Sequence, residues 1–281
     1  MQTIRSVKKM QAVAWKIAAG KMKSALVPTM GALHDGHLTL IKRARKAADI
    51  VIVSVFVNPA QFGPKEDFKR YPRDEKGDLK KIKKAGGNIV FMPKAVEIYP
   101  ADYETYVSVE KMSGVLEGVV RPGHFRGVTT IVSKLFNITR PDVAVFGMKD
   151  YQQAIVIKKM TRDMGYPVEI IIAPTVREED GLAMSSRNRY LDEIGRWEAV
   201  CLFYALRTAQ EMVKAGIFDT RLITREMQAV ILATSPSAQI DYIAFTDKET
   251  LTTVKKVVKN TVCSLAVRLH GVRLIDNMKL K

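Results

Sequence analysis

The 281-residue chain contains only two cysteines, Cys201 and Cys263, which lie far apart in the sequence. They do not suggest a disulfide framework or a zinc cluster, both of which need more cysteines at short spacings. We expect both to be small buried apolar residues. No stretch approaches the roughly 20 apolar residues that span a bilayer. The N-terminal 28 residues carry scattered lysines and no apolar core with a cleavage site, unlike a secretory signal. The sequence therefore predicts a cytoplasmic protein without a membrane partner.

Acidic residues are also scarce, since 45 lysines and arginines face 29 aspartates and glutamates and give a formal net charge of +16. Such an excess favours phosphate backbones through counterion release, which makes nucleic acid one candidate partner. However, aromatic residues make up only 7% of the chain, and no platform of interleaved aromatic and basic residues is present. The lysines of residues 79–87 and 252–260 alternate with apolar residues, which is typical of solvated faces. We therefore expect no nucleic-acid partner.

Short aliphatic runs alternate with amphipathic stretches over the first 175 residues. Strands are predicted at residues 24–28, 49–58, 88–93, 142–147 and 168–174, and helices at 37–49, 75–86, 127–140 and 151–165. Continuous aliphatic strands separated by helices predict a parallel sheet covered on both faces, with right-handed crossovers. Residues 1–175 should therefore form a doubly wound, Rossmann-like α/β domain.

The pattern changes after about Val176. Helix-like segments at residues 191–216 and 220–235 precede strand-like segments at 239–247, 254–270 and 272–278. Helices followed by adjacent strands with short turns predict a smaller α+β domain with an antiparallel sheet, over residues 176–281. We see no internal repeat or low-complexity linker.

Residues suited to chemistry recur where the predicted strands end, which is where open parallel sheets bind ligands. They lie in "PTMGALHDGH" (28–37), "NPAQFG" (58–63), "GMKD" (147–150) and "APTVREEDGLAMSSRN" (173–188). In the first motif, Gly31 and Gly36 permit tight turns, and the helix that follows directs its free amides and positive dipole end at a ligand. His34 and His37 can donate hydrogen bonds to phosphate and can become cationic, because their usual pKa is near 6.5.

Two alternatives compete with this phosphate-binding interpretation. A zinc site needs three or four ligands, and His124 and His270 are the only further histidines. An ordinary turn histidine would explain either His34 or His37 alone. The joint occurrence of both histidines with the proline, glycines and threonine of the motif favours phosphate.

The motif "PTMGALHDGHLTLI" (28–41) resembles the HxGH signature of the nucleotidyltransferase superfamily that includes class I aminoacyl-tRNA synthetases. In detail the chain is similar to the pantothenate synthetase (pantoate-β-alanine ligase) family. The similarity continues through residues 56–74, 116–153 and 177–191, in the family's order. It covers essentially the whole first domain and the junction.

This resemblance implies an AMP-forming ligase that joins pantoate to β-alanine. A carboxylate and an amine form a salt in water, so the pantoate carboxylate first attacks the α-phosphorus of ATP and expels pyrophosphate. The β-alanine amine then attacks the pantoyl-adenylate and expels AMP, giving pantothenate. The resemblance also implies a homodimer. Mg²⁺ is expected because it neutralises ATP phosphates. The position of residues 177–188 at the domain junction predicts that the C-terminal domain closes as a lid and shields the adenylate from water.

Carried over position by position, the resemblance assigns residues to the nucleotide. His37 would donate a proton to the departing phosphate, His34 would contact phosphate, Lys149 would neutralise its charge and Asp150 would accept bonds from the ribose. Ser185, Ser186 and Arg187 complete the catalytic set. The full ATP set is Met30, Gly31, Ala32, Leu33, His34, Asp35, Gly36, His37, Gly147, Met148, Lys149, Asp150, Val176, Met184, Ser185, Ser186 and Arg187.

The resemblance assigns pantoate to Gln61 and Gln153, whose neutral amides both donate and accept hydrogen bonds, and places Gln61 near β-alanine. Further substrate contacts would come from Pro28, Thr29, Met30, Asn58, Tyr71, Arg121 and His124. Structural alternatives exist for several of these residues. Arg121 and His124 could brace a loop, Tyr71 could be a surface aromatic, and Ser185 and Ser186 could cap a helix as well as bind phosphate.

The chain departs from the family pattern at Met148, where an acidic residue is common. It has Ala183 at the first lysine position of the KMSKS loop found in the synthetase relatives, so Lys149 and Arg187 would supply positive charge. No acidic cluster identifies ligands for Mg²⁺, and Asp78 and Glu117 are only candidates. Two other functions stay open: a nucleotidyltransferase that forms a dinucleotide, and a non-enzymatic RNA-binding protein on a synthetase-like scaffold.

Overall fold

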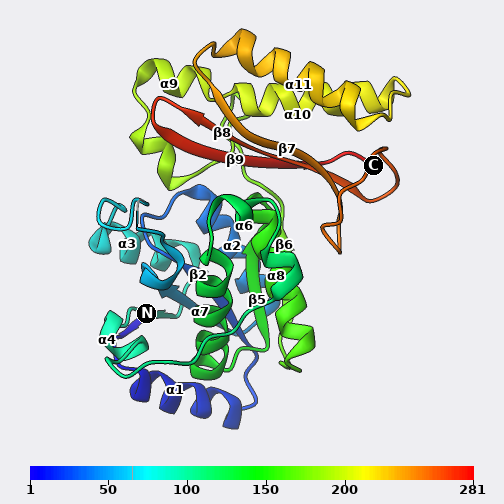
Figure 1. The fold of residues 1–281 in the computed structure, drawn as a ribbon. Helices are drawn as coiled ribbons and strands as arrows, with labels where there is room; N and C mark the ends of the chain where they lie inside the picture. The colour runs from blue at the N-terminus through cyan, green and yellow to red at the C-terminus, as the bar shows by residue number, and fades with distance from the viewer. Residues whose placement is uncertain (65) are drawn as a thin grey trace. The chain divides into compact units, whose positions relative to one another are not determined.

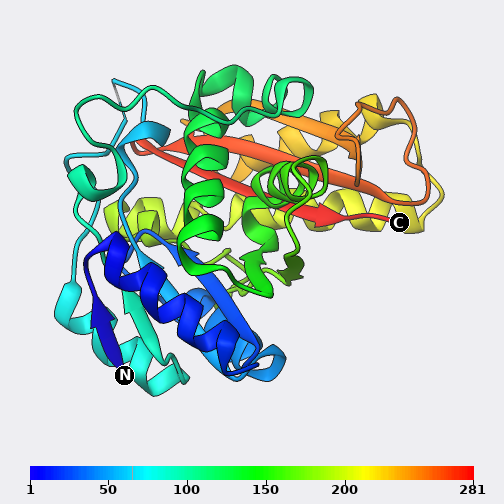
Figure 2. The ribbon, with the colours of Figure 1, turned by 90° about the horizontal axis from the view of Figure 1, so that it is seen from below.

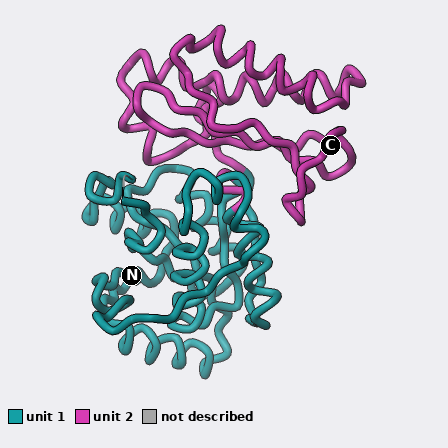
Figure 3. The backbone as a smooth tube through the Cα atoms, viewed as in Figure 1, with its two compact units in different colours: residues 1–148, 153–174 teal, residues 149–152, 175–281 magenta. Residues whose placement is uncertain are grey.

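The computed structural model describes residues 1–64 and 66–281. The chain divides into two compact units, which we describe separately (Figure 3). Unit 1 contains residues 1–148 and 153–174, and unit 2 contains residues 149–152 and 175–281. Within the described ranges, no helix has the length and apolar character needed to cross a membrane.

Unit 1 is built on a six-stranded sheet in which all neighbouring strands are parallel (Figure 1). The order across the sheet is β1-β4-β3-β2-β5-β6. The strands are β1 (Gln2–Ile4), β2 (Ser24–Thr29), β3 (Ile50–Val55), β4 (Ile89–Phe91), β5 (Val143–Gly147) and β6 (Glu169–Ala173). The helices are α1 (Val7–Ala19), α2 (Asp35–Ala47), α3 (Glu75–Ala85), α4 (Ala95–Ile98), α5 (Glu110–Ser113), α6 (Glu117–Val120), α7 (His124–Thr139) and α8 (Tyr151–Asp163).

Both faces of this sheet are buried by helices. Successive strand residues point to opposite sides, so neighbouring residues of one strand belong to different cores. Leu26 and Ile52 pack in a core with residues of α1, α7 and α8. Their neighbours Val27 and Val53 pack in a second core with residues of α2 and α3. Figure 2 shows α1 and α7 beside one another on their shared side of the sheet. The predicted doubly wound α/β fold is confirmed.

All five predicted strands of this unit are present within a few residues of the expected bounds. The structure adds β1, which pairs with β4 at the sheet edge and has only three residues. Such a short strand gives no periodic signal. It also adds α1, whose buried residues Met10, Ala14 and Ile17 recur at helical spacing.

The order of the strands locates a ligand site from topology alone. From β2 the chain runs through α2 to β3 on one side, whereas β5 and β6 lie on the other side of β2. The connections therefore diverge between β2 and β5. In open α/β sheets such a switch point, at the carboxyl ends of the strands, is where ligands bind. The HxGH loop follows β2 and the "GMKD" segment follows β5.

Unit 2 contains a three-stranded antiparallel sheet of order β7-β8-β9. Its elements are α9 (Glu193–Glu198), α10 (Cys201–Lys214), α11 (Thr220–Thr234), β7 (Gln239–Asp247), β8 (Thr261–Leu269) and β9 (Val272–Lys279). Residues of α10 and α11 share one core with the sheet, including Leu202, Ile223 and Leu265. The expected small α+β unit with an antiparallel sheet is confirmed. Cys201 and Cys263 are free and buried, as expected.

Two sequence predictions in unit 2 were wrong in their extent. The single helix expected over residues 191–216 is two helices, because the chain turns at Ala199 and Val200 between α9 and α10. The strand expected over 254–270 begins only at Thr261. Residues before it form irregular backbone that ends at Asn260, with a φ of +73°. The valines at 254, 257 and 258 resemble the composition of a strand, and no periodic pattern indicates the turn before Thr261.

Candidate active site

The HxGH loop after β2 makes a left-handed turn that the neighbouring helix α3 holds in place. Gly31 and Ala32 have φ values of +86° and +51°. Ala32 carries a side chain, so this conformation costs roughly 1 kcal/mol. The carboxylate of Asp78 accepts the N–H groups of Ala32 at 2.8 Å and Leu33 at 2.7 Å. One turn further along α3, Lys81 donates to the carbonyl oxygen of Leu33 at 2.7 Å. These three bonds offset the cost of the turn.

Asp78 is buried, with 1% of its surface exposed. Burial raises the pKa of its carboxyl group, partly opposed by the N–H bonds from Leu33 and Ala32 and by the charge of Lys81. Both of its oxygens accept backbone bonds, so they fit a structural role and do not fit a magnesium ligand. Among the described residues, no group of three or more His, Cys, Asp or Glu side chains is placed to hold a metal ion. The structure therefore gives no support to Asp78 or Glu117 as metal ligands.

The two histidines of the motif lie against one another at the start of α2. His34 is the N-cap residue of this helix, and its backbone N–H donates to Nδ1 of His37 at 3.4 Å. The two ring centroids are 4.1 Å apart, with the rings tilted by 49°. A ring nitrogen that accepts a hydrogen bond carries no proton, so the neutral His37 ring carries its proton on Nε2. This arrangement makes Nε2 of His37 a hydrogen-bond donor.

The backbone amides of the loop divide into two groups. The N–H groups of residues 31–34 all donate within the protein: to Thr29 Oγ1, to Asp78 and to His37. Thr29 itself donates to the Ser54 carbonyl oxygen at 2.7 Å, which joins the ends of β2 and β3. Residues 35–37 form the first turn of α2, where N–H groups have no backbone acceptor within the helix, and the His37 N–H meets the His34 side chain in a capping box. An anion at this loop would therefore be met by the helix turn.

Gln61 lies in a short 3₁₀ turn after β3, η1 (Pro59–Gln61), and its side chain is held by Asn58. The Asn58 side chain accepts the Ala60 N–H at 3.3 Å and donates to the Gly127 carbonyl at 3.1 Å. The Ala60 N–H can only donate and the Gly127 carbonyl can only accept, so these two contacts fix which end of the Asn58 amide is oxygen. Asn58 Nδ2 then donates to Gln61 Oε1 at 3.0 Å.

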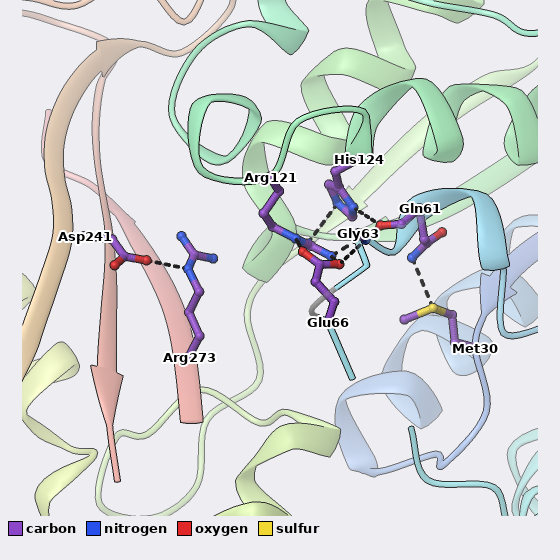
Figure 4. A network of polar contacts seen from close by, with 8 residues as sticks. All are labelled: Met30, Gln61, Gly63, Glu66, Arg121, His124, Asp241 and Arg273. Atoms are coloured by element: carbon purple, nitrogen blue, oxygen red, sulfur yellow. Dashed lines mark hydrogen bonds and ion pairs between the residues drawn. The ribbon is translucent and has the colours of Figure 1, made fainter. Parts of the chain in front are cut away.

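The remaining end of the Gln61 amide is its NH₂ group, which donates to the Met30 sulfur at 3.1 Å (Figure 4). A thioether is a weak acceptor. A carboxylate or hydroxyl oxygen would accept the same bond more strongly, so this amide is suited to an oxygen-rich ligand. On the other side of the network, the Tyr99 hydroxyl donates to Asn58 Oδ1 at 2.8 Å. Tyr99 could not be predicted from the sequence as part of this network, because it lies 41 residues from Asn58.

Arg121 and His124 are engaged with protein groups (Figure 4). His124 Nδ1 donates to the Gln61 carbonyl oxygen at 2.9 Å, and Arg121 donates to His124 Nε2 at 3.1 Å. Arg121 also makes two bonds to the Glu66 carboxylate, at 2.6 and 2.9 Å. Burial, and then the charge of Arg121, lowers the pKa of His124 to about 4, so its ring is neutral. These contacts match the loop-bracing alternative and add Glu66, which the sequence analysis did not single out.

The other residues assigned to pantoate also lie in unit 1. Tyr71 is 5% exposed and packs edge-on against Phe62, with ring centroids 6.0 Å apart, so the surface-aromatic alternative was wrong. Gln153 lies at the start of α8, which follows β5, and is half-buried. Pro28 lies within β2 opposite Ser54 of β3. Gln61, the HxGH loop and Gln153 thus follow β3, β2 and β5, which are adjacent in the sheet.

Gly147 and Met148 lie in unit 1, and unit 2 carries the remaining nucleotide candidates on two segments. Lys149 Nζ lies 3.7 Å from the Asp150 carboxylate. In the second segment, the Val176 carbonyl accepts the Met184 N–H at 3.0 Å, and Arg177 forms an isolated bridge with Ala183. Ser185 caps the 3₁₀ turn η3 (Ser186–Tyr190), since its hydroxyl accepts the Arg187 N–H at 3.2 Å. The capping alternative for Ser185 is confirmed.

The doubly wound sheet, with the HxGH loop at its switch point, defines a nucleotide-binding enzyme of the α/β class. A family model described as pantoate-beta-alanine ligase matches residues 2–279. The chain is 50% identical over 281 residues to the pantothenate synthetase of Moorella thermoacetica, covering 100% of this chain and 98% of the relative. The chain belongs to the pantoate-β-alanine ligase family.

Solved structures agree with this assignment. A crystal structure of the Thermus thermophilus pantothenate synthetase matches with a TM-score of 0.94 and 43% identity, covering 100% of this chain and 99% of that one. The Francisella tularensis ligase, described as complexed with β-γ ATP and β-alanine, matches with a TM-score of 0.82 and 32% identity, covering 99% and 97%. The activity is the ATP-dependent condensation of pantoate with β-alanine to pantothenate, through pantoyl-adenylate, with release of AMP and pyrophosphate.

Proposed function

We propose that the histidine pair at the start of α2 is the centre for forming pantoyl-adenylate. The observation that carries this proposal is the bond from the His34 N–H to His37 Nδ1. It leaves the His37 proton on Nε2, ready to be donated to the phosphate group that departs. The amides of the first turn of α2 and His34 add fixed donors for the same charge.

In the first step, a pantoate carboxylate oxygen attacks the α-phosphorus of ATP and the bond to pyrophosphate breaks. His37 stabilises the charge that develops on the leaving oxygen. In the second step, the β-alanine amine attacks the acyl carbon, loses a proton and expels AMP. Because there is little covalent work for the protein in phosphoryl chemistry, its contribution is alignment and charge stabilisation.

Lys149 and Arg187 supply the positive charge that the family's synthetase relatives take from a KMSKS lysine. Asp150 accepts hydrogen bonds from the ribose, and the backbone of Val176 faces the adenine. The ATP set consists of residues 30–37, 147–150, Val176 and 184–187. Its members with catalytic roles are His34, His37, Lys149, Ser185, Ser186 and Arg187.

Pantoate is held by Gln61 and Gln153. The Gln61 NH₂ group exchanges the Met30 sulfur for a pantoate oxygen, which the orientation set by Asn58 supports. Pro28, Thr29 and Tyr71 shape the same pocket, and Arg121 and His124 support its wall through the Gln61 carbonyl. β-Alanine, which the Francisella tularensis relative binds according to its description, lies near Gln61.

Mg²⁺ would accompany ATP and would neutralise charge on its phosphates. The described residues offer no side-chain cluster for it, so no protein ligand is assigned. We further propose that the enzyme is a cytoplasmic homodimer and that residues 176–281 act as a lid domain. Protection of residues 177–188 from protease by ATP plus pantoate would support the lid, and equal cleavage with and without them would contradict it.

The experiment measures AMP and pyrophosphate release from ATP, Mg²⁺ and pantoate, with β-alanine added or withheld, and identifies the product by mass. The expected result is pantothenate only in the complete mixture. His37→Ala should slow adenylate formation by a factor on the order of 10² to 10⁴. The matched control is His270→Asn in unit 2, because His270 has a φ of +48° that asparagine tolerates. Near-normal turnover by His37→Ala would remove His37 from this role.

Gln153→Ala tests the pantoate pocket separately. It removes an amide that the proposal assigns to pantoate, so the KM for pantoate should rise while ATP binding is largely retained. An unchanged dependence of the rate on pantoate concentration would contradict the assignment.

A further inference from the structure

The second half of β9 contains two adjacent buried polar residues that the reaction as described does not use. Asp276 is 3% exposed and Asn277 is 4% exposed. The Asp276 carboxylate receives two bonds from the Arg177 guanidinium, at 2.6 and 3.1 Å. Buried polar groups are costly unless paired, and this pair is bidentate, which is the strongest geometry available to arginine and carboxylate. Asp276 therefore holds Arg177 in a defined orientation.

Through Arg177, Asp276 fixes the segment that carries Val176 and residues 184–187. Arg177 also donates to the Gly181 carbonyl oxygen at 3.0 Å and stacks over the Phe203 ring at 4.9 Å. Its backbone bridges Ala183, so the segment folds back on itself directly before Met184. Added bulk at Gly181 is excluded, because a Cβ there would lie 2.1 Å from Phe203. The segment is thus closed around Arg177.

Asn277 fixes the other nucleotide segment of unit 2. Its Nδ2 donates to the Lys149 carbonyl oxygen at 2.9 Å. Residues 149–152 follow β5 in the sequence and include the first two residues of α8, yet they belong to unit 2 by their contacts. Tyr151 strengthens this attachment, since its hydroxyl donates to the Lys248 carbonyl oxygen. Lys149 is therefore held through its backbone carbonyl. Its ammonium group can contact Asp150 or a ligand without breaking this bond.

We infer that Asp276 and Asn277 are positioning residues that set the two ATP-binding segments of unit 2 in one frame. Consecutive Cα atoms are about 3.8 Å apart across a trans peptide, so the two anchors have a fixed separation. The inference rests on the proposed assignment of Lys149 and residues 184–187 to ATP. A buried ion pair often adds little net stability. We therefore assign the Asp276–Arg177 pair to the orientation of the ATP-binding segment and not to the stability of the fold.

The test uses the adenylate-forming half of the reaction, followed as exchange of labelled pyrophosphate into ATP in the presence of pantoate. Asn277→Ala removes the bond to Lys149 and should raise the KM for ATP or lower kcat by about 10-fold, as expected for a misplaced charge. The KM for pantoate should change less than about 2-fold, because pantoate is assigned to unit 1. Glu198→Gln is the control, since it weakens another ion pair of unit 2, to His270 at 3.1 Å.

A double variant separates positioning from stability. Asp276→Leu combined with Arg177→Met replaces the pair with apolar side chains. Such a replacement generally retains stability, but it removes the bidentate contact that orients the ATP-binding segment. We expect a melting temperature close to that of the wild type together with an ATP KM raised by about 10-fold. Recovery of both the melting temperature and the wild-type ATP KM would overturn the inference.

Lys149→Ala and Arg187→Ala distinguish failure of this inference from failure of the proposed function. If neither variant affects the KM for ATP or kcat, the assignment of these segments to ATP fails, and with it that part of the proposed function. If both reduce exchange while Asn277→Ala behaves like Glu198→Gln, only the positioning role fails.

Discussion

Replacing Asp78 by asparagine tests whether α3 sets the shape of the HxGH loop. The carboxylate accepts two N–H groups, from Ala32 and Leu33, whereas an amide of the same shape offers one oxygen and one NH₂ group. One buried N–H would therefore face a donor. The substitution leaves size and helix position unchanged, so its effect reports on these two bonds.

The magnitude follows from two opposing contributions. Losing a charge-assisted N–H bond costs about 1.5 to 3 kcal/mol, but removing a buried charge recovers part of this cost. Burial raises the pKa of Asp78, which shows that the ionised form is held at a cost. We expect a net loss of about 1 to 2 kcal/mol in the free energy of unfolding. If this loss falls on the left-handed turn, each ~1.4 kcal/mol lowers the fraction of molecules with a competent loop tenfold, so kcat/KM for ATP should fall about 5- to 30-fold.

Urea denaturation measures the first quantity, and pyrophosphate exchange measures the second. Asp74→Asn is the matched control, because Asp74 caps α3 by accepting the Gly77 N–H at 3.0 Å and asparagine caps equally well. Its exchange rate should match that of the wild type. The reasoning is refuted if Asp78→Asn exchanges at the wild-type rate, or if both variants lose exchange to the same extent.

Three other predictions follow from the described contacts. Gly127→Ala places a Cβ 2.1 Å from a carbonyl oxygen of η1. It should lower the free energy of unfolding by about 1 to 3 kcal/mol and raise the KM for pantoate. The control Gly123→Asn, where nothing lies within 4 Å of the added Cβ, should change neither quantity. Tyr99→Phe removes the bond to Asn58 and should raise the KM for pantoate severalfold with the KM for ATP unchanged; equal rises in both would argue against it. His124 has a pKa of about 4 when folded against 6.5 when free, so between these values only the unfolded chain binds this proton. The free energy of unfolding should therefore fall as the pH drops through this window, by up to ~3 kcal/mol, and a His124→Gln variant with the same slope would contradict this origin.

Helices and strands could be predicted from the sequence, because each depends on the spacing of apolar residues within one short segment. The aliphatic strands, the helices between them and the C-terminal antiparallel sheet all leave a pattern over adjacent residues. The break between α9 and α10 leaves none, since the apolar residues on both sides keep helical spacing. The order of the strands could not be read either, because pairing joins residues far apart in the sequence.

The same division applies to the site. The HxGH loop and the "MSSR" run were identified from the sequence because the motif residues are neighbours in the chain. The sequence indicated Asp78 only as a candidate ligand of Mg²⁺, whereas its carboxylate binds a loop 45 residues away. Asp276 pairs with Arg177 across 99 residues, and no local pattern indicates this. Supporting residues of this kind become visible only once the chain is folded.

The left-handed turn at Gly31 and Ala32 also has a thermodynamic consequence for the nucleotide. Since Asp78 and Lys81 hold the turn within unit 1, the conformational entropy of the loop is lost during folding and not when ATP arrives. A loop ordered beforehand adds no ordering penalty to the binding free energy. Calorimetry on isolated ATP binding should then assign little unfavourable entropy to this loop, and Asp78→Asn should shift the loss from folding to binding, with a more negative binding entropy at similar enthalpy.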